Sequence, residues 1–139
     1  PDERRVEVDR RSLDLNDEIL VCRRAAEILA VCRRSLSEFS SVNAATAVHR
    51  VAKLPGGEAV VPSPCFLELA GRALELLRRP GFNEARGLGN TAWAFAPLGL
   101  RDGPLLASLS AAAIAKITEF EHQGIANTAW SLAALAVLG

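Results

Sequence analysis

The phrase Asn-Thr-Ala-Trp occurs twice, and its two asparagines, Asn90 and Asn127, lie 127 − 90 = 37 residues apart. Their amides are able to hydrogen-bond a base edge, as polar side chains of base-reading repeats do. Trp93 and Trp130 carry rings on which bases could stack. The alternative for both residue types is a structural role. An asparagine that is repeated without change suits a ladder of hydrogen bonds between repeats. An aromatic ring among Ala, Gly and Leu usually packs in a core. We expect core packing for the tryptophans; both uses stay open for the asparagines, with the structural one favoured.

Polar residues that differ between the copies are better candidates for recognising a ligand. Asn43, Arg86 and Gln123 hold matching places early in three similar segments, and Arg50 and Lys53 fall on the predicted exposed side of the first. Arginine and lysine pair with phosphates, whereas asparagine and glutamine read base edges. An ordinary solvated face explains such residues equally well. We therefore predict a ligand-binding set that comprises these five residues together with the two repeated asparagines.

No motif for catalysis accompanies these residues. The chain lacks HExxH, GxSxG and GxxxxGK[ST], and its two histidines, His49 and His122, have no cysteine at the spacing of a zinc site. The cysteines Cys22, Cys32 and Cys65 are odd in number and form no CxxC, so we expect free thiols that act as small hydrophobic residues. The sequence therefore predicts neither an enzyme nor a bound cofactor or metal.

Composition restricts the remaining possibilities. Half of the 139 residues are hydrophobic, which allows a sizeable core, and 16 basic residues balance 16 acidic ones. Zero net charge counts against strong non-specific binding of nucleic acid by this segment alone. No apolar run of about 18 residues exists, so we expect no membrane span. The sequence contains no methionine and ends directly after an apolar helical run. We therefore expect an internal fragment of a longer protein, and a fragment of this kind would lack any targeting peptide.

The hydrophobic period is helical almost throughout, and we expect six helices in three pairs. Residues 1–15 are dense in charge and poor in apolar side chains, which predicts a linker or a frayed end. Pro97 should end or kink its helix, because it cannot donate the backbone hydrogen bond. The expected helices run from a cap at Asn16 or Asp17 to about Arg34, from Ser40 or Ser41 to about Lys53, from Ser63 with Pro64 in the first turn to Pro80, from Asn83 to Pro97, from Asp102 to about Thr118, and from about His122 to Val137.

Three segments share one pattern: FSSVNAATAVHRVAKL (39–54), FNEARGLGNTAWAFAPL (82–98) and FEHQGIANTAWSLAAL (120–135). Each begins with Phe and ends with Leu, and His49 takes the place of the tryptophan in the first. A recurrence of about 40 residues made of two helices predicts an α-solenoid, here of about three helix–turn–helix repeats over 16–54, 63–99 and 102–139. The predicted repeat core comprises Phe39, Leu54, Phe82, Trp93, Leu98, Phe120, Trp130 and Leu135.

The segments LGNTAWAFAPLG and GIANTAWSLAAL, with RDGPLLASL after the first, resemble the helical repeats of octotricopeptide-repeat proteins. They are also similar to the leucine-rich helical repeats of FAST-kinase-like and RAP-domain proteins and to a domain of an RNA-editing substrate-binding complex protein. The resemblance covers about residues 17–139 and is strongest over 82–139. It implies a right-handed solenoid that binds single-stranded RNA in the mitochondrion or the chloroplast, in RNA processing, stability or translation.

Two other functions remain open at this point. A protein–protein interaction scaffold is the main alternative, since many α-solenoids bind peptides or partner proteins, and the neutral net charge favours it. A structural spacer between functional modules is the second. The expected partners are therefore single-stranded organellar RNA and, beside it, other proteins of an RNA-processing complex.

Overall fold

The computed structural model describes residues 3–79, 84–99, 103–115 and 133, and within these ranges the chain forms helices and no strand. The predicted all-α class is confirmed. The expected helix over about 122–137, apart from residue 133, and the expected caps Asn83 and Asp102 lie outside the described residues. The helices are α1 (Glu3–Leu20), α2 (Ala25–Ser35), the short 3-10 helix η1 (Leu36–Glu38), α3 (Ser41–Lys53), the single turn α4 (Gly57–Val60), α5 (Pro64–Leu77), α6 (Glu84–Leu98) and α7 (Gly103–Ala115).

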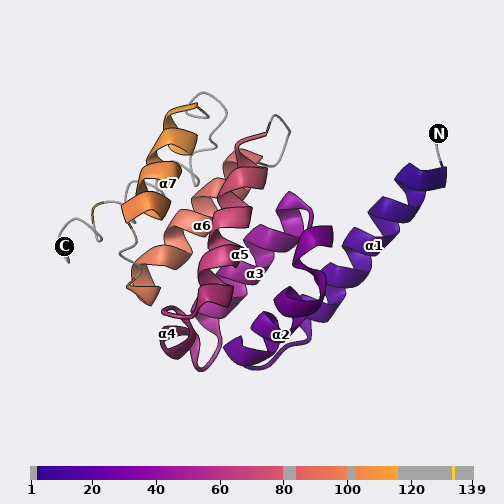
Figure 1. The fold of residues 1–139 in the computed structure, drawn as a ribbon, viewed down its shortest axis with the longest axis horizontal. Coiled ribbons are helices and arrows are strands. Elements are labelled where there is room, and N and C mark those ends of the chain that lie inside the picture. The colour runs from indigo at the N-terminus through magenta and orange to yellow at the C-terminus, as the bar shows by residue number, and fades with distance from the viewer. Residues whose placement is uncertain (1–2, 80–83, 100–102, 116–132, 134–139) are drawn as a thin grey trace.

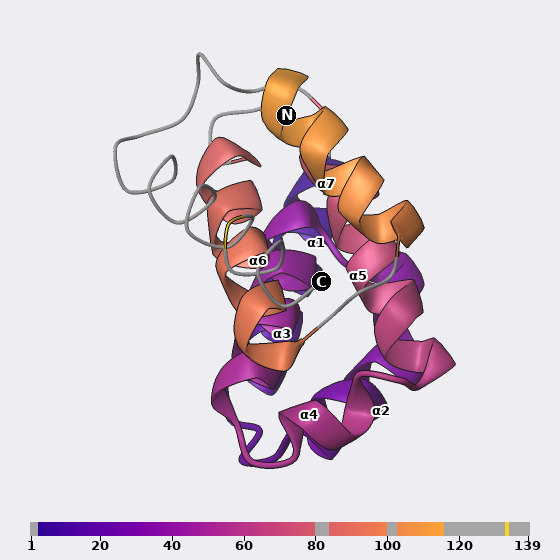
Figure 2. The same ribbon diagram turned by 90° about the vertical axis from the view of Figure 1, so that its left-hand side faces the viewer.

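The helices pack in two layers. In one layer α3 contacts α1 on one side and α6 on the other, and in the second layer α5 contacts α2 and α7. Figure 2 shows α3 and α6 together on the left and α5 and α2 together on the right. The layers are joined by contacts of α2 and α5 with α3, and of α5 and α7 with α6. Consecutive helices thus alternate between layers from α2 onward, apart from the single turn of α4.

Serine caps determine where two of the helices begin. The Ser40 hydroxyl accepts a hydrogen bond from the Asn43 backbone N–H, and the Ser63 hydroxyl accepts one from the Phe66 N–H. Pro64 occupies the first turn of α5, where a missing N–H removes no helical hydrogen bond. The predicted starts at Ser40 and Ser63 are confirmed, because these caps depend only on neighbouring residues.

The predicted stop at Pro97 is confirmed to within one residue. Helix α6 ends at Leu98, and Gly99 follows with φ +66°, the left-handed conformation that commonly terminates a helix. The Gly99 N–H donates to the Ala96 carbonyl and satisfies one of the last helical acceptors. Proline and glycine together therefore end this helix.

The expectation for the N-terminal region was wrong. Helix α1 covers most of residues 1–15, where we expected a linker or frayed end, and it ends at Leu20. Buried Leu15 and Ile19 attach it to the core. The Arg11 guanidinium donates to the Glu38 carboxylate at 2.9 and 3.0 Å. These partners lie 27 residues away in sequence, so a local charge pattern does not reveal them.

A turn also divides the single helix that we expected over about 17–34. Arg24 is extended, with φ −137° and ψ 150°, and the Ala25 N–H donates to the Pro55 carbonyl of a distant loop. The Glu27 carboxylate accepts a hydrogen bond from the Arg23 N–H and supports the new helix start. No glycine or proline marks this turn, which is why hydrophobic periodicity runs through it.

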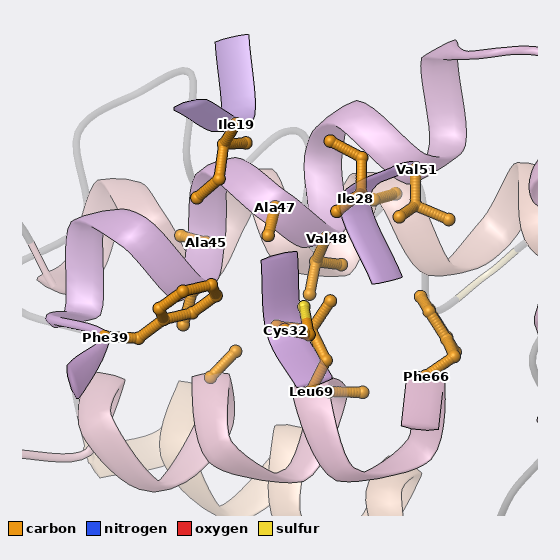
Figure 3. Packing of buried hydrophobic residues seen from close by; sticks show 14 of the residues in the cluster. Ile19, Ile28, Cys32, Phe39, Ala45, Ala47, Val48, Val51, Phe66 and Leu69 are labelled. Carbon is orange, nitrogen blue, oxygen red and sulfur yellow. The ribbon is translucent and has the colours of Figure 1, made fainter. Parts of the chain in front are cut away.

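The core lies between the two layers, and Figure 3 shows Val48 and Val51 of α3 facing Cys32 of α2 and Phe66 and Leu69 of α5. Of the predicted repeat core, Phe39 and Leu98 are buried, whereas Leu54 and Trp93 are partly buried against the core. Phe82, Phe120, Trp130 and Leu135 lie outside the described residues.

The three cysteines are free thiols. Cys22 and Cys32 are buried, and Cys65 is partly buried. Burial raises the pKa of the Cys32 thiol to about 12, with a smaller contribution from Cys65. Cys32 is therefore protonated at physiological pH, in keeping with its predicted use as a small hydrophobic residue.

Candidate functional site

A groove of about 360 Å³ lies between α3 and α6, and we call it the α3–α6 groove. Thr46, His49 and Arg50 line it from α3, and Gly87 and Asn90 line it from α6. Arg50 and Asn90 belong to the predicted ligand-binding set. The groove therefore brings together candidates that are 40 residues apart in the sequence.

Matching positions of the predicted repeats meet across this groove. His49 and Trp93, which hold the same place in FSSVNAATAVHRVAKL and FNEARGLGNTAWAFAPL, have ring centroids 5.0 Å apart at an angle of 51°. Thr46 holds the place of Asn90, and both line the groove. Helices α3 and α6 therefore lie side by side with equivalent positions facing each other, as consecutive repeats of a stack would.

A small residue allows this close approach. A Cβ atom added to Gly87 would lie 2.7 Å from Leu77 Cδ2 and 3.6 Å from the Ala45 Cβ. A side chain at this position would thus force the end of Leu77 to move. Gly87 is part of the segment between the predicted cap and the Asn-Thr-Ala-Trp phrase, and its lack of a side chain allows α6 to pack near α3 and α5.

Trp93 has more polar surroundings than its own helix predicts. Its neighbours one turn away along α6 are Gly89, Asn90, Ala96 and Pro97. Helix α3 adds His49 and places the Lys53 ammonium 5.7 Å from the ring centroid. This distance is within the range of a cation–π contact. The ring is partly buried, so one part packs on the core while α3 supplies a cation and an imidazole beside it.

Arg50 connects the groove to the end of α1. One guanidinium nitrogen, Nη2, donates to the Cys22 carbonyl at 3.3 Å, and Nε is buried with no acceptor among the described residues. Lys53, one turn further along α3, is exposed. Arg50 therefore lines the groove and is partly committed to the fold, whereas Lys53 does not line it and lies over the Trp93 ring.

The prediction that Asn43 contacts a ligand was wrong, because its side chain is fully buried and saturated with hydrogen bonds. Its Oδ1 accepts from the Ser40 N–H at 3.0 Å and from the Ser12 hydroxyl at 3.3 Å. Its Nδ2 donates to the Ser12 carbonyl at 2.9 Å and to Asn16 Oδ1 at 3.3 Å. An asparagine amide has two acceptor sites and two donors, so none remains for a ligand. Asn43 instead connects α1 to the start of α3.

Three other members of the predicted ligand-binding set have side chains outside the described residues. They are Arg86, whose backbone lies in α6, and Gln123 and Asn127.

Sequence reasoning did not select Thr46 or His49, although both line the groove. The available signal was their equivalence to Asn90 and Trp93, since equivalent positions of neighbouring repeats lie next to each other.

Burial and two nearby cations favour the neutral form of His49. Its pKa is lowered from the ordinary value by desolvation and then by the nearby cations Lys53 and Arg50. A neutral imidazole has one donor and one acceptor, so it is able to hydrogen-bond a polar ligand group. The positive charge at this groove thus comes from Arg50 and Lys53.

This lowered pKa gives a testable pH dependence. The lowered pKa means that folded His49 binds a proton less readily than unfolded His49. As the pH falls through the ordinary histidine range, the unfolded chain therefore takes up a proton that the folded chain does not yet bind. We expect the free energy of unfolding to fall between pH 7.5 and pH 5.0 by more in the wild-type chain than in His49→Gln. Urea unfolding at both pH values measures the difference. An equal fall in both proteins would contradict a desolvated His49.

In the part of the chain that the structure describes, no three His, Cys, Asp or Glu side chains are placed to hold a metal ion. No helix in the described ranges is long and apolar enough to cross a membrane. The chain matches no protein-family model, no curated protein and no solved structure.

Proposed function

We propose that this chain is a segment of an octotricopeptide-like α-solenoid that binds single-stranded RNA along the α3–α6 groove without catalysis. The observation that carries the proposal is the grouping of Arg50, Lys53, Asn90 and the His49–Trp93 ring pair on two adjacent helices. The resemblance of the LGNTAWAFAPLG text supports it independently. By the same resemblance, the protein acts in mitochondrial or chloroplast RNA processing, stability or translation, beside other proteins of an RNA-processing complex.

The solenoid part of the proposal is supported by the packing of α3 and α6. Each helix is the second member of a pair, after α2 and α5 respectively, and the first members are also neighbours. Such a two-layer stack places equivalent side chains at regular intervals along one face. A flexible single strand can follow that face, with one part of the strand at each repeat.

The groove offers the chemistry that a single strand requires. Arginine and lysine neutralise phosphates, aromatic rings stack on bases, and amides hydrogen-bond base edges. With 16 basic and 16 acidic residues, the whole chain contributes no net attraction. Affinity for RNA would therefore depend strongly on the few cations beside the groove, which makes substitution of Arg50 and Lys53 a sensitive test.

We expect the full chain to bind a single-stranded RNA oligonucleotide in a filter-binding titration, with affinity that falls as salt increases. The double variant Arg50→Gln with Lys53→Gln should bind more weakly, and the slope of log K against log salt should be shallower by about 1.4, from about 0.7 for each lost phosphate contact with a single strand. A series of titrations between low and physiological salt measures both quantities.

Arg10→Gln with Arg78→Gln is the matched control, because both arginines are exposed, do not line the α3–α6 groove and carry the same total charge as Arg50 and Lys53. This control should retain most of the wild-type affinity. Equal losses in the two double variants would show that only the overall charge matters, and the proposed location would then be wrong. Binding that does not respond to salt would contradict the RNA proposal itself.

The protein–protein interaction scaffold is the second candidate, and one observation favours it. Leu20 and Val42 are exposed apolar side chains that line the α3–α6 groove. Such residues suit an apolar partner segment better than a phosphate backbone. A chain that fails to bind RNA at low salt, while Leu20→Ser abolishes capture of a defined protein partner, would favour the scaffold.

A further inference from the structure

A second groove lies elsewhere in the fold and shares no lining residue with the first. It has a volume of about 700 Å³ and is formed by α2, η1 and α5, and we call it the α2–α5 groove. Arg33 and Arg34 at the end of α2 line it together with Arg72 of α5. Neither the Asn-Thr-Ala-Trp phrase nor the predicted ligand-binding set includes any of these residues.

The groove carries a local excess of positive charge. Its three arginines face one lining carboxylate, Glu68, in a chain whose total charge is zero. The thiol of Cys32 also lines the groove, and since burial raises its pKa to about 12, it adds no negative charge at physiological pH. An anion in this groove would therefore meet a net attraction.

The existing ion pairs leave these guanidinium groups available. Arg34 lies 3.9 Å from the Glu18 carboxylate and Arg72 lies 3.4 Å from that of Glu75, and the Glu18 and Glu75 side chains are 40% and 60% exposed. Exposed ion pairs at such distances are weak and screened by salt. Arg33 forms no ion pair within the part of the chain that the structure describes.

Arg72 also retains an unused donor. Its Nε is buried and has no hydrogen-bond acceptor among the described residues, while the side chain as a whole is 28% exposed. A buried guanidinium N–H without an acceptor is unfavourable, so a ligand oxygen that reaches it gains more than one that meets a solvated donor. Nε and Nη together form the planar fork that binds two oxygens of one phosphate.

We propose that the α2–α5 groove is a phosphate-binding site, in which Arg33, Arg34 and Arg72 hold a phosphate group of a nucleotide or of a nucleic-acid strand. Its volume is in the range of sites that accept ligands of nucleotide size. Phosphate suits the groove better than a carboxylate, because it offers more oxygens and more charge to three guanidinium groups. The site does not depend on the proposed RNA contact at the α3–α6 groove.

Isothermal titration of the full chain with inorganic pyrophosphate, in a phosphate-free buffer, tests the site directly. We expect saturable binding by the wild-type chain and a loss of at least about tenfold in affinity in Arg33→Gln with Arg72→Gln, since each variant residue removes charge-assisted hydrogen bonds. The control Arg10→Gln with Arg78→Gln should bind as the wild type does. Glu68→Gln should bind pyrophosphate more tightly than the wild type does, because it removes the carboxylate that lines the groove. This variant tests the site even if the arginine variants are less stable.

An RNA arm identifies the source of the phosphate. If single-stranded RNA binds more weakly to the Arg33/Arg72 variant than to the control, the strand itself supplies the phosphate, even where pyrophosphate alone binds poorly. Arg50→Gln with Lys53→Gln should leave pyrophosphate binding unchanged, which separates this site from the proposed function. If neither ligand distinguishes the Arg33/Arg72 variant from the control, the inference is overturned.

Discussion

Phe95→Ala is expected to lower the free energy of unfolding by about 3–5 kcal/mol, the usual cost of truncating a buried aromatic ring. Phe95 follows the first Asn-Thr-Ala-Trp phrase, and its side chain is 0% exposed. Its helix, α6, contacts α3, α5 and α7, so the cavity would open where both layers meet. Urea unfolding followed by far-UV circular dichroism measures the change.

Val21→Ala is the control for this substitution. Val21 is 75% exposed and lies just after α1, so its truncation should change the free energy of unfolding by no more than about 0.5 kcal/mol. A loss below about 1 kcal/mol for Phe95→Ala would contradict the placement of α6 in the core. The paired result would thus decide whether the Asn-Thr-Ala-Trp helix is an integral part of the stack.

Asn43→Ala is expected to cost about 2–4 kcal/mol of stability, because it removes half of a capping box and leaves buried partners unsatisfied. The substitution removes the hydrogen bond from the Ser40 N–H to Asn43 Oδ1, while the backbone N–H of residue 43 still donates to the Ser40 hydroxyl. It also leaves the Ser12 carbonyl and Asn16 without the Nδ2 donor that connects α1 to α3. Urea unfolding again measures the loss.

Two comparisons distinguish the components of this loss. Ser63→Ala removes the cap on α5 together with the hydrogen bond from the Ser63 hydroxyl to the Val60 carbonyl, and it should cost about 1 kcal/mol. Asn43→Asp retains the acceptor for the Ser40 N–H but places a buried carboxylate oxygen against two acceptors, the Ser12 carbonyl and Asn16 Oδ1, so it should cost at least as much stability as Asn43→Ala. An Asn43→Ala chain that keeps its stability but loses RNA binding would restore Asn43 to the ligand-binding residues.

The helix boundaries that sequence predicted well are those with local causes. Ser40 and Ser63 cap their helices through backbone groups three residues away, and Pro97 with Gly99 ends α6. The boundaries that it missed depend on distant partners. Helix α1 is held by Glu38, and the turn before α2 by the Pro55 carbonyl, and neither contact leaves a mark in the neighbouring sequence.

The same distinction between local causes and distant partners applies to the candidate site. Periodicity placed Arg50 and Lys53 toward the outside of α3, and the structure places Arg50 in the α3–α6 groove and Lys53 over the Trp93 ring. Asn43 was assigned to ligand binding because asparagine at a variable position suits base recognition, yet it completes a capping box that also reaches α1. The contact of Trp93 with His49 depends on how α3 meets α6, which no single helix pattern contains.

The fluorescence of Trp93 tests the central proposal most directly, because this ring lies beside Lys53 and His49 at the proposed RNA contact. The chain has two tryptophans, so Trp130→Phe leaves Trp93 as the only indole emitter. The measurement is a titration of this variant with single-stranded RNA at low salt. We expect saturable quenching that weakens as salt rises and is lost when Arg50→Gln and Lys53→Gln are added. Emission that stays unchanged at RNA concentrations where the chain binds RNA, or quenching that survives the loss of both cations, would contradict the proposal.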